Sequence, residues 1–216
     1  MSRMIFDFDI EEKTNKTSLF DFKYDYIIGT DEAGRGPGAG PVYAAAVCFK
    51  NYDGLYDILY KLNDSKKLNE KTREELFPLI KQYGIYSINK VEVETIEKIN
   101  ILNASLYAME QSVTEVIKQL NSDNVLILVD GNKKIKNLKY NQKTIIKGDS
   151  KSAAIAAASI LSKVSRDNFM YELDKKYPDY NFKKNKGYLT KEHIEALKSR
   201  GITKEHRKSF LKNILK

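Results

Sequence analysis

The chain has 216 residues, of which 42% are hydrophobic and 31% charged, and it carries a formal net charge of +8 with a sequence pI of about 9.2. This length suits one well-packed domain, and the composition excludes an intrinsically disordered chain. The excess of positive charge favours a polyanionic partner, either a nucleic acid or an anionic membrane surface.

Few side chains are available for disulfide or zinc chemistry. The chain has one cysteine, Cys48, and two histidines. One cysteine cannot form an internal disulfide, and three such ligands are too few for a standard structural zinc site. No apolar stretch approaches the roughly 20 residues needed to span a bilayer, and the N-terminus lacks the pattern of a secretion signal. We therefore expect a cytoplasmic protein without a membrane segment.

Apolar residues follow two alternating periods along the chain, which predicts strands interspersed with helices. The expected strands are residues 26–29, 42–49, 85–91, 125–129 and 143–146. The expected helices are residues 53–62, 69–83, 100–120, 150–177, 191–200 and 204–215. The pattern predicts an α/β fold with a central mixed sheet flanked by helices.

The expected domain organisation is simple. Residues 1–24 are polar without a clear period, and we expect an N-terminal arm there. Residues 25–216 form a single expected domain, whose C-terminal part from about residue 178 is helical. The alanine-rich start of the helix over 150–177 would let that helix approach the sheet closely.

Four carboxylates stand at the ends of expected strands. Asp31 and Glu32 follow the first strand, Asp130 follows the aliphatic strand over 125–129, and Asp149 follows the strand over 143–146. Ligands of open α/β sheets bind at strand ends, so these acids can converge. Clustered carboxylates repel one another unless a cation neutralises them, and Mg²⁺ prefers such oxygen ligands. Two ions about 4 Å apart would activate water for phosphodiester hydrolysis.

Simpler interpretations of these residues stay open at this point. Asp130 precedes Gly131 and suits a plain turn, and Asp149 suits a helix cap. The glycine-rich residues 34–40 fit neither a P-loop nor a dinucleotide fingerprint. They would either let the backbone approach a sugar–phosphate closely, with Arg35 between glycines, or form a flexible turn.

Several ordered motifs resemble those of type 2 ribonuclease H, the ribonuclease HII family. They are Gly29-Thr30-Asp31-Glu32-Ala33-Gly34-Arg35-Gly36-Pro37, Asp64-Ser65-Lys66-Lys67-Leu68, Val129-Asp130-Gly131-Asn132, Lys147-Gly148-Asp149, Lys163-Val164-Ser165-Arg166-Asp167, Asn185-Lys186-Gly187-Tyr188 and Gly201-Ile202-Thr203-Lys204-Glu205-His206-Arg207. Together they cover nearly the whole chain from residue 29 to about residue 210.

The resemblance implies a ribonuclease H-like fold with a C-terminal helical extension. It also implies cleavage on the 5′ side of a ribonucleotide in RNA–DNA hybrids and in duplex DNA with embedded ribonucleotides, leaving a 3′-hydroxyl and a 5′-phosphate. The implied catalytic and metal-binding acids are Asp31, Glu32, Asp130 and Asp149, with two Mn²⁺ or Mg²⁺ ions when substrate is bound. We expect a monomer.

The resemblance also assigns substrate contacts. Gly34, Arg35 and Gly36 would contact the 2′-hydroxyl and a neighbouring phosphate, and Tyr188 would stack on the next sugar. The 2′-hydroxyl is the group by which a protein distinguishes RNA from DNA. Further candidate substrate contacts are Ser65, Lys66, Lys67, Lys183, Lys184, Lys186 and Arg207, although each basic residue also suits a solvated surface.

Asp167 competes with Asp149 as the fourth acid. The two would lie about 27 Å apart along one helix, at ~1.5 Å per residue, so they cannot share metal ions. We expect Asp167 to pair with a basic neighbour instead.

The chain departs from the family pattern at three positions. Leu189 stands where the family normally has glycine, Gly38 where it normally has leucine, and Ser162 where it normally has alanine. We expect little functional effect from Gly38 and Ser162, whereas Leu189 affects the conformation of the loop after Tyr188.

Three rival functions fit parts of the sequence. One is a nuclease that needs several consecutive ribonucleotides, as in types 1 and 3, and Tyr188 with the Gly-Arg-Gly segment argues against it. The second is an RNA–DNA binding module without catalysis, which the four retained acids do not support. The third is a small-molecule phosphatase, for which the net charge of +8 is a poor fit.

Overall fold

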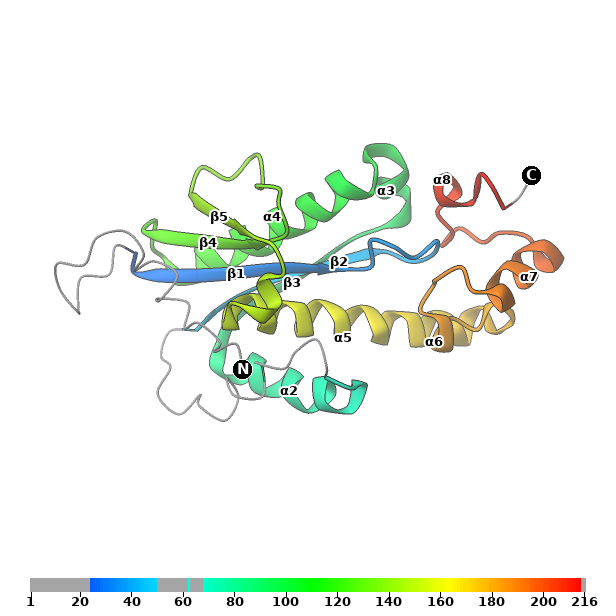
Figure 1. Cartoon of the computed structure of the whole chain (residues 1–216), viewed down its shortest axis with the longest axis horizontal. Helices are drawn as coiled ribbons and strands as arrows, with labels where there is room; N and C mark the ends of the chain where they lie inside the picture. Colours follow the sequence, from blue (N-terminus) through cyan, green and yellow to red (C-terminus); the bar gives the residue numbers. More distant parts are fainter. Residues whose placement is uncertain (1–23, 50–61, 63–67, 215–216) are drawn as a thin grey trace.

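The computed structural model describes residues 24–49, 62 and 68–214. Five strands form one mixed sheet in the order β3-β2-β1-β4-β5 (Figure 1). The strands are β1 Tyr26–Ala33, β2 Val42–Phe49, β3 Gly84–Val91, β4 Val125–Asp130 and β5 Asn141–Ile145. β2 pairs antiparallel with both β1 and β3, whereas β4 runs parallel to β1 and β5 parallel to β4. The predicted α/β class with a central mixed sheet is confirmed.

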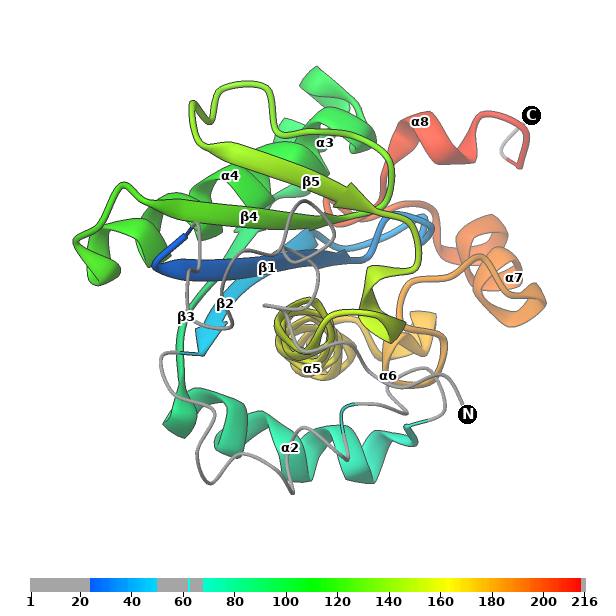
Figure 2. The ribbon, with the colours of Figure 1, turned by 60° about the vertical axis from the view of Figure 1, so that its left-hand side comes forward.

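Helices cover both faces of this sheet. The helical elements are α2 Glu70–Tyr83, α3 Val93–Ile99, α4 Ile101–Leu120, η3 Gly148–Ser150, α5 Ala153–Lys176, η4 Pro178–Tyr180, α6 Phe182–Asn185, α7 Lys191–Arg200 and α8 Lys208–Leu211. Figures 1 and 2 show α4 on one face, and α5 with α2 on the other. Strand β2 supplies both cores, because Ala44 and Ala46 pack with α4 while Ala45 and Val47 pack with α5 and α2.

The alanine-rich half of α5 lies directly against β1. A Cβ atom placed on Gly29 would lie 2.3 Å from backbone atoms of Ala154 and Ile155. Residues 153–158 are all buried. Small side chains therefore allow the close helix–sheet approach that the sequence predicts, and any larger residue at Gly29 would push α5 away.

Some element boundaries differ from those predicted. β1 continues through Ala33, so Asp31 and Glu32 lie inside the strand, because they pair with Ala45 and Ala44 of β2. The helix predicted from residue 150 begins at Ala153, and a short η3 turn precedes it.

Near the C-terminus, α8 is shorter than the predicted 204–215. The preceding segment extends to form an isolated antiparallel bridge between His206 and Ala39, which a helix could not make. The short helix α3 was not predicted.

Apart from Tyr24 and Leu62, the predicted N-terminal arm and the helix over 53–62 fall outside the described residues.

The C-terminal helices have an apolar core of their own. Met170 and Leu173 from the second half of α5 pack with Phe182 of α6, Leu197 of α7 and Leu211 of α8. Figure 2 shows these helices gathered beside the connection between β1 and β2. The extension thus stands next to the glycine-rich connection that follows the β1 acids. Among the described residues, no helix has the length and apolar character that crossing a membrane requires.

Candidate active site

Two neighbouring parallel strands and the turn after β5 bring the predicted acids to one edge of the sheet. Thr30 of β1 lies beside Val129 of β4, so Asp31 and Asp130 occupy the next positions of the same pair of strands. The backbone N–H of Gly148 donates to Asp130 Oδ1 at 2.6 Å. This bond ties β4 to the η3 turn that carries Asp149.

The acids are placed where their charge is unfavourable. Asp31 is 7% exposed. Burial, followed by the negative charges of Glu32 and Asp130, raises the pKa of the Asp31 carboxyl well above its ordinary value. Hydrogen bonds from Ser159 and from the Glu32 N–H, at 2.7 Å, oppose that rise. Burial also raises the pKa of Glu32, and Arg35, at 3.1 Å, opposes it. Asp31, Glu32 and Asp130 therefore form one repelling group.

The chemistry of this group fits a hard divalent cation, although the carboxylates are held apart. Over residues 24–49, 62 and 68–214, no three Asp, Glu, His or Cys side chains are gathered as ligands around one point. Instead, each of three carboxylates accepts a hydrogen bond: Asp31 from Glu32, Glu32 from Arg35 and Asp130 from Gly148. All the atoms that could bind a metal here are carboxylate oxygens, and a cation would relieve the repulsion between them. The four-acid metal site stays a prediction.

Two buried arginines hold the connection between β1 and β2. The Arg207 guanidinium is fully buried and donates to backbone carbonyls of Gly34, Arg35, Pro37 and Gly40 at 2.7–3.3 Å. Arg166 of α5 donates to carbonyls of Ala39, Pro41 and Lys186 at 3.0–3.1 Å. The shape of the loop over residues 34–41 is therefore set by arginines from two distant parts of the chain.

Gly34 is required by this packing. Its φ of +102° lies in the region that glycine favours, and a Cβ placed on it would lie 2.2 Å from Arg166 Nε. The backbone thus leaves β1 directly over the Arg166 guanidinium.

The residues expected to contact the ribonucleotide lie together. Tyr188 is 52% exposed, and a Cβ placed on the exposed Gly36 would lie 3.2 Å from Tyr188 Cε1. The side chain of Arg35 is 51% exposed and bonded to Glu32. An aromatic ring, a bare stretch of backbone and a cation therefore stand next to the acids of β1.

The predicted basic contacts have different fates. Arg207 cannot meet a phosphate at the surface as predicted, because its guanidinium is buried against carbonyls. The Lys186 ammonium lies 3.7 Å from the Tyr171 ring centroid and donates to the Lys183 carbonyl. Lys183 and Lys184 are exposed, and Lys184 lies 3.1 Å from Glu192. Ser65, Lys66 and Lys67 fall outside the described residues.

Asp167 does pair with a basic neighbour, as predicted. Its carboxylate accepts from Lys163 Nζ at 2.6 Å, one turn earlier on α5. This contact accounts for a buried acid that the site does not use.

Sequence reasoning missed a buried hydroxyl beside the acids. A cavity of about 140 Å³ is lined by Glu32, Arg35, Ser105, Asp130 and Lys133, among others. Ser105 of α4 is buried, and its Oγ has no hydrogen-bond partner among the described residues. At ~30 Å³ per molecule the cavity has room for water. No periodicity signals such a residue, since serine at this position fits the buried face of α4 equally well.

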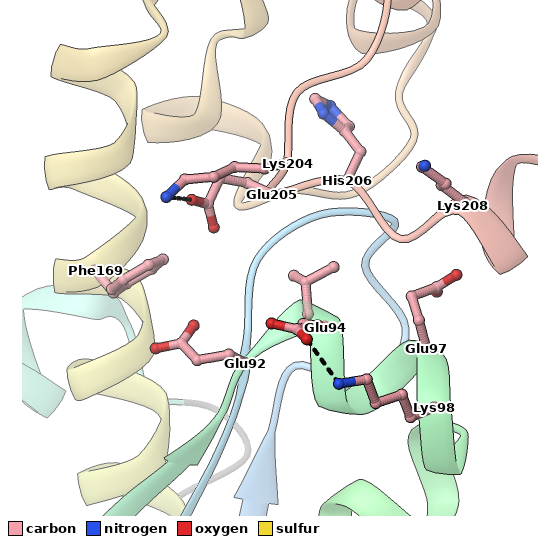
Figure 3. A pocket seen from close by; sticks show the side chains of 10 residues that line it. Glu92, Glu94, Glu97, Lys98, Phe169, Lys204, Glu205, His206 and Lys208 are labelled. Atoms are coloured by element: carbon pink, nitrogen blue, oxygen red, sulfur yellow. Dashed lines mark hydrogen bonds and ion pairs between the residues drawn. The ribbon is translucent and has the colours of Figure 1, made fainter.

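A second cavity, of about 780 Å³, lies away from the acids. Figure 3 shows it between the start of α3, Phe169 of α5 and the segment over residues 204–208. Its charges pair locally, with Lys98 at 2.6 Å from Glu94 and Lys204 at 3.9 Å from Glu205. Glutamates and lysines mixed in this way do not favour a polyanion.

The strand order, the mixed strand directions and the acids on the two central strands define an α/β protein of the ribonuclease H-like class. The family model of ribonuclease HII matches residues 28–213. A ribonuclease HII from Fusobacterium nucleatum is 50% identical over 202 residues, which are 93% of each chain. The solved ribonuclease H2 of Pyrococcus horikoshii superposes with a TM-score of 0.69 at 26% identity, covering 88% of this chain and 96% of its own.

A more distant structure shares the fold. Bst-RNase HIII, solved in complex with Mn²⁺, superposes with a TM-score of 0.66 at 15% identity, over 86% of this chain and 64% of its own. The family match and the 50% identity decide between the types: the chain belongs to the ribonuclease HII family and is an enzyme.

Proposed function

We propose that this enzyme hydrolyses the phosphodiester on the 5′ side of a ribonucleotide, in RNA–DNA hybrids and in duplex DNA with single embedded ribonucleotides, leaving a 3′-hydroxyl and a 5′-phosphate. Ribonuclease HII activity, the cleavage of RNA in RNA–DNA hybrids, comes with membership of the family. The observation that carries the finer assignment is the place of the Tyr188 ring, whose Cε1 lies 3.2 Å from a Cβ placed on Gly36.

Recognition of one ribonucleotide needs groups that meet the 2′-hydroxyl and the next sugar at the same time. Gly36 has no side chain, so the backbone of the Gly-Arg-Gly segment is open to a close approach by the sugar–phosphate. The exposed ring of Tyr188 lies next to Gly36 and offers a flat surface to the neighbouring sugar. Arg35 adds a cation for the adjacent phosphate. The arrangement therefore supports recognition of a single RNA–DNA junction.

The proposed metal ligands are Asp31, Glu32, Asp130 and Asp149, holding two Mn²⁺ or Mg²⁺ ions when substrate is bound. Such ions supply an activated water and stabilise the leaving oxygen. Support comes from the repulsion among Asp31, Glu32 and Asp130, and the Mn²⁺ complex of the distant Bst-RNase HIII is consistent with it. In this chain Ser159 orients Asp31, Arg35 holds Glu32, and the Gly148 N–H holds Asp130.

The remaining assignments rest on charge and composition. A net charge of +8 suits a duplex substrate, and nothing in the proposed chemistry requires a second subunit, so we assign a monomer. A single cysteine, which cannot form an internal disulfide, supports activity in the reducing cytoplasm.

The test uses a labelled DNA duplex that carries one ribonucleotide, with Mn²⁺ or Mg²⁺, beside an all-DNA duplex and a continuous RNA–DNA hybrid. We expect one cut 5′ to the ribonucleotide, absent from the all-DNA control and abolished by a chelator. Cleavage of the hybrid alone would move the enzyme to the class that needs several ribonucleotides. Binding without any cut would remove the catalytic assignment of the acids.

A further inference from the structure

The chain's two histidines meet in the C-terminal helical part. His193 of α7 and His206 are both buried, and their Nε2 atoms lie 3.0 Å apart. The rings of Tyr180 and Phe182 pack against both imidazoles, with centroids 5.0–6.2 Å away. Figure 3 shows that the His206 imidazole points away from the cavity beside its backbone. Neither histidine belongs to the acids or to the predicted substrate contacts.

The hydrogen-bond partners of the two rings fix where their protons lie. His193 Nδ1 is 2.9 Å from the Tyr188 carbonyl oxygen, which can only accept, so His193 must carry its proton on Nδ1. Its Nε2 is then an acceptor. His206 Nδ1 accepts the Thr203 N–H at 3.0 Å, so His206 carries its proton on Nε2 and donates it to His193. The bonds form one directed chain from Thr203 to Tyr188.

Both ends of this chain border the substrate-recognition residues. At one end, the carbonyl of Tyr188 is fixed while its ring stays exposed beside Gly36. At the other end, His206 bridges Ala39, and the Glu205 carbonyl accepts the Gly40 N–H at 2.8 Å. This chain of hydrogen bonds therefore joins the Tyr188 backbone to the loop over residues 34–41.

We propose that the His193–His206 pair is a positioning device for ribonucleotide recognition, which locks the Tyr188 backbone to the Gly-Arg-Gly loop in one register. Both rings act while neutral and in opposite tautomers. This inference rests on the proposed function, because it requires Tyr188 to touch the ribonucleotide. Neither histidine touches substrate, and each acts through the position of the Tyr188 ring.

Two matched variants of His193 separate the two bonds of that ring. The amide of glutamine reaches the place of Nε2, so His193→Gln keeps a contact with His206 and loses the donor to Tyr188. The amide of asparagine stands near Nδ1, so His193→Asn keeps that donor and loses His206. We expect His193→Gln to lower kcat/KM on the single-ribonucleotide duplex about fivefold, the effect of one hydrogen bond, and His193→Asn to lower it less. Cleavage of a continuous RNA–DNA hybrid should fall less in both.

A double-mutant cycle with Tyr188→Ala decides whether the histidine acts through Tyr188. In the Tyr188→Ala background, His193→Gln should have no further effect on the single-ribonucleotide rate. Equal losses on both substrates, or a loss that adds in full to that of Tyr188→Ala, would overturn the positioning role. A wild-type chain that cuts the hybrid but never the single ribonucleotide would instead overturn the proposed function.

The tautomers can be observed without any substrate. Because the chain has only two histidines, ¹⁵N-resolved imidazole spectra contain two ring systems. At neutral pH we expect one ring protonated at Nδ1 and the other at Nε2, and His193→Asn removes the Nδ1–H signal set. Two rings both protonated at Nε2, or a charged ring at neutral pH, would exclude the directed chain.

Discussion

The Leu189 side chain lies where a side chain at position 38 would have to go, so Gly38 leaves room for it. A Cβ placed on Gly38 would lie 2.7 Å from Leu189 Cδ2 and 2.8 Å from its Cγ. These are two of the three positions at which the sequence departs from the ribonuclease HII pattern, which normally has leucine at position 38 and glycine at position 189. Leu189 therefore fills the space that a side chain at position 38 would need. The Leu189 side chain, next to Tyr188 in the sequence, packs against the core of the C-terminal helices.

The first prediction is a size exchange at this contact. Gly38→Leu alone should overpack against Leu189 and lower the unfolding free energy by about 1–3 kcal/mol. Leu189→Gly alone should also destabilise, because it removes a half-buried side chain that packs on the C-terminal core. The double variant should recover most of the loss, which urea denaturation of the four proteins would measure as a coupling free energy. Additive losses would show that the two side chains do not share one space.

The second prediction concerns Arg207. Lysine keeps the positive charge but cannot reach several carbonyls in a planar fork, so Arg207→Lys leaves buried carbonyls without donors. We expect the unfolding free energy to fall by ~2–4 kcal/mol, measured by urea denaturation. The matched control is Arg35→Lys, whose exposed side chain should contribute within about 0.5 kcal/mol. Equal small effects at both positions would remove the role of Arg207 as the clamp of the loop.

The third prediction is a pH dependence of stability from the histidine pair. Burial, followed by repulsion from His193, lowers the pKa of His206 to about 4. Burial also lowers the pKa of His193, and the rings of Tyr180 and Phe182 that pack against both histidines provide no negative charge. Between pH 6.5 and about 4 the unfolded chain therefore binds more protons than the folded one, so the unfolding free energy falls as the pH falls.

The measurement for this pair is urea denaturation at pH 7 and pH 5. His206→Gln, which cannot be protonated, should show a smaller loss between the two pH values than the wild-type chain. The carboxylates titrate in both proteins, so the difference isolates the histidine. An identical pH dependence in both would mean that His206 does not stay neutral in the folded chain.

Local periodicity was sufficient to predict the strands of the sheet, but it did not predict the contacts that shape the loop over residues 34–41. β2 was predictable because every residue from Val42 to Phe49 is apolar apart from Tyr43, as a strand between two cores requires. The placement of Asp31 and Asp130 on neighbouring strands follows from the parallel pairing of β1 with β4, although Asp31 and Glu32 lie inside β1 and not beyond its end. The arginine clamp was not predictable, since Arg166 and Arg207 reach the loop over residues 34–41 from more than 120 residues away and bind backbone carbonyls, which have no sequence signal. The hydrogen bonds between His193 and His206 were not predictable for the same reason, because the tautomers of the two rings are set by three-dimensional contacts.

The fourth prediction is that Asp130→Asn abolishes cleavage while leaving duplex binding within about twofold. Asparagine keeps the acceptor oxygen for the Gly148 N–H, so the η3 turn should stay in place. It removes the negative charge that the proposed cations need. Cleavage gels and binding titrations on the same single-ribonucleotide duplex would measure both effects. Turnover near the wild-type rate would remove Asp130 from the proposed ligands.

The fifth prediction compares the effect of the Asp31 charge on stability with its effect on cleavage. The Asp31 carboxyl has its pKa raised by burial and by the charges of Glu32 and Asp130. Because the folded pKa lies above the unfolded one, the folded chain binds more protons in the interval between them, so stability falls as the pH rises through that interval. At pH 7 without divalent cations, Asp31→Asn should therefore raise the unfolding free energy by about 1 kcal/mol while abolishing cleavage.

Asp167→Asn is the matched control for Asp31, because Asp167 is also a buried acid but is paired with Lys163 at 2.6 Å. Removing its charge leaves Lys163 without that partner, so this variant should be less stable than wild type, not more. Addition of Mn²⁺ should raise the melting temperature of the wild-type chain and of Asp167→Asn. The melting temperature of Asp31→Asn should rise much less. If Asp31→Asn is less stable than wild type, or if Mn²⁺ raises the melting temperatures of the three proteins equally, Asp31 is not a ligand of the cation.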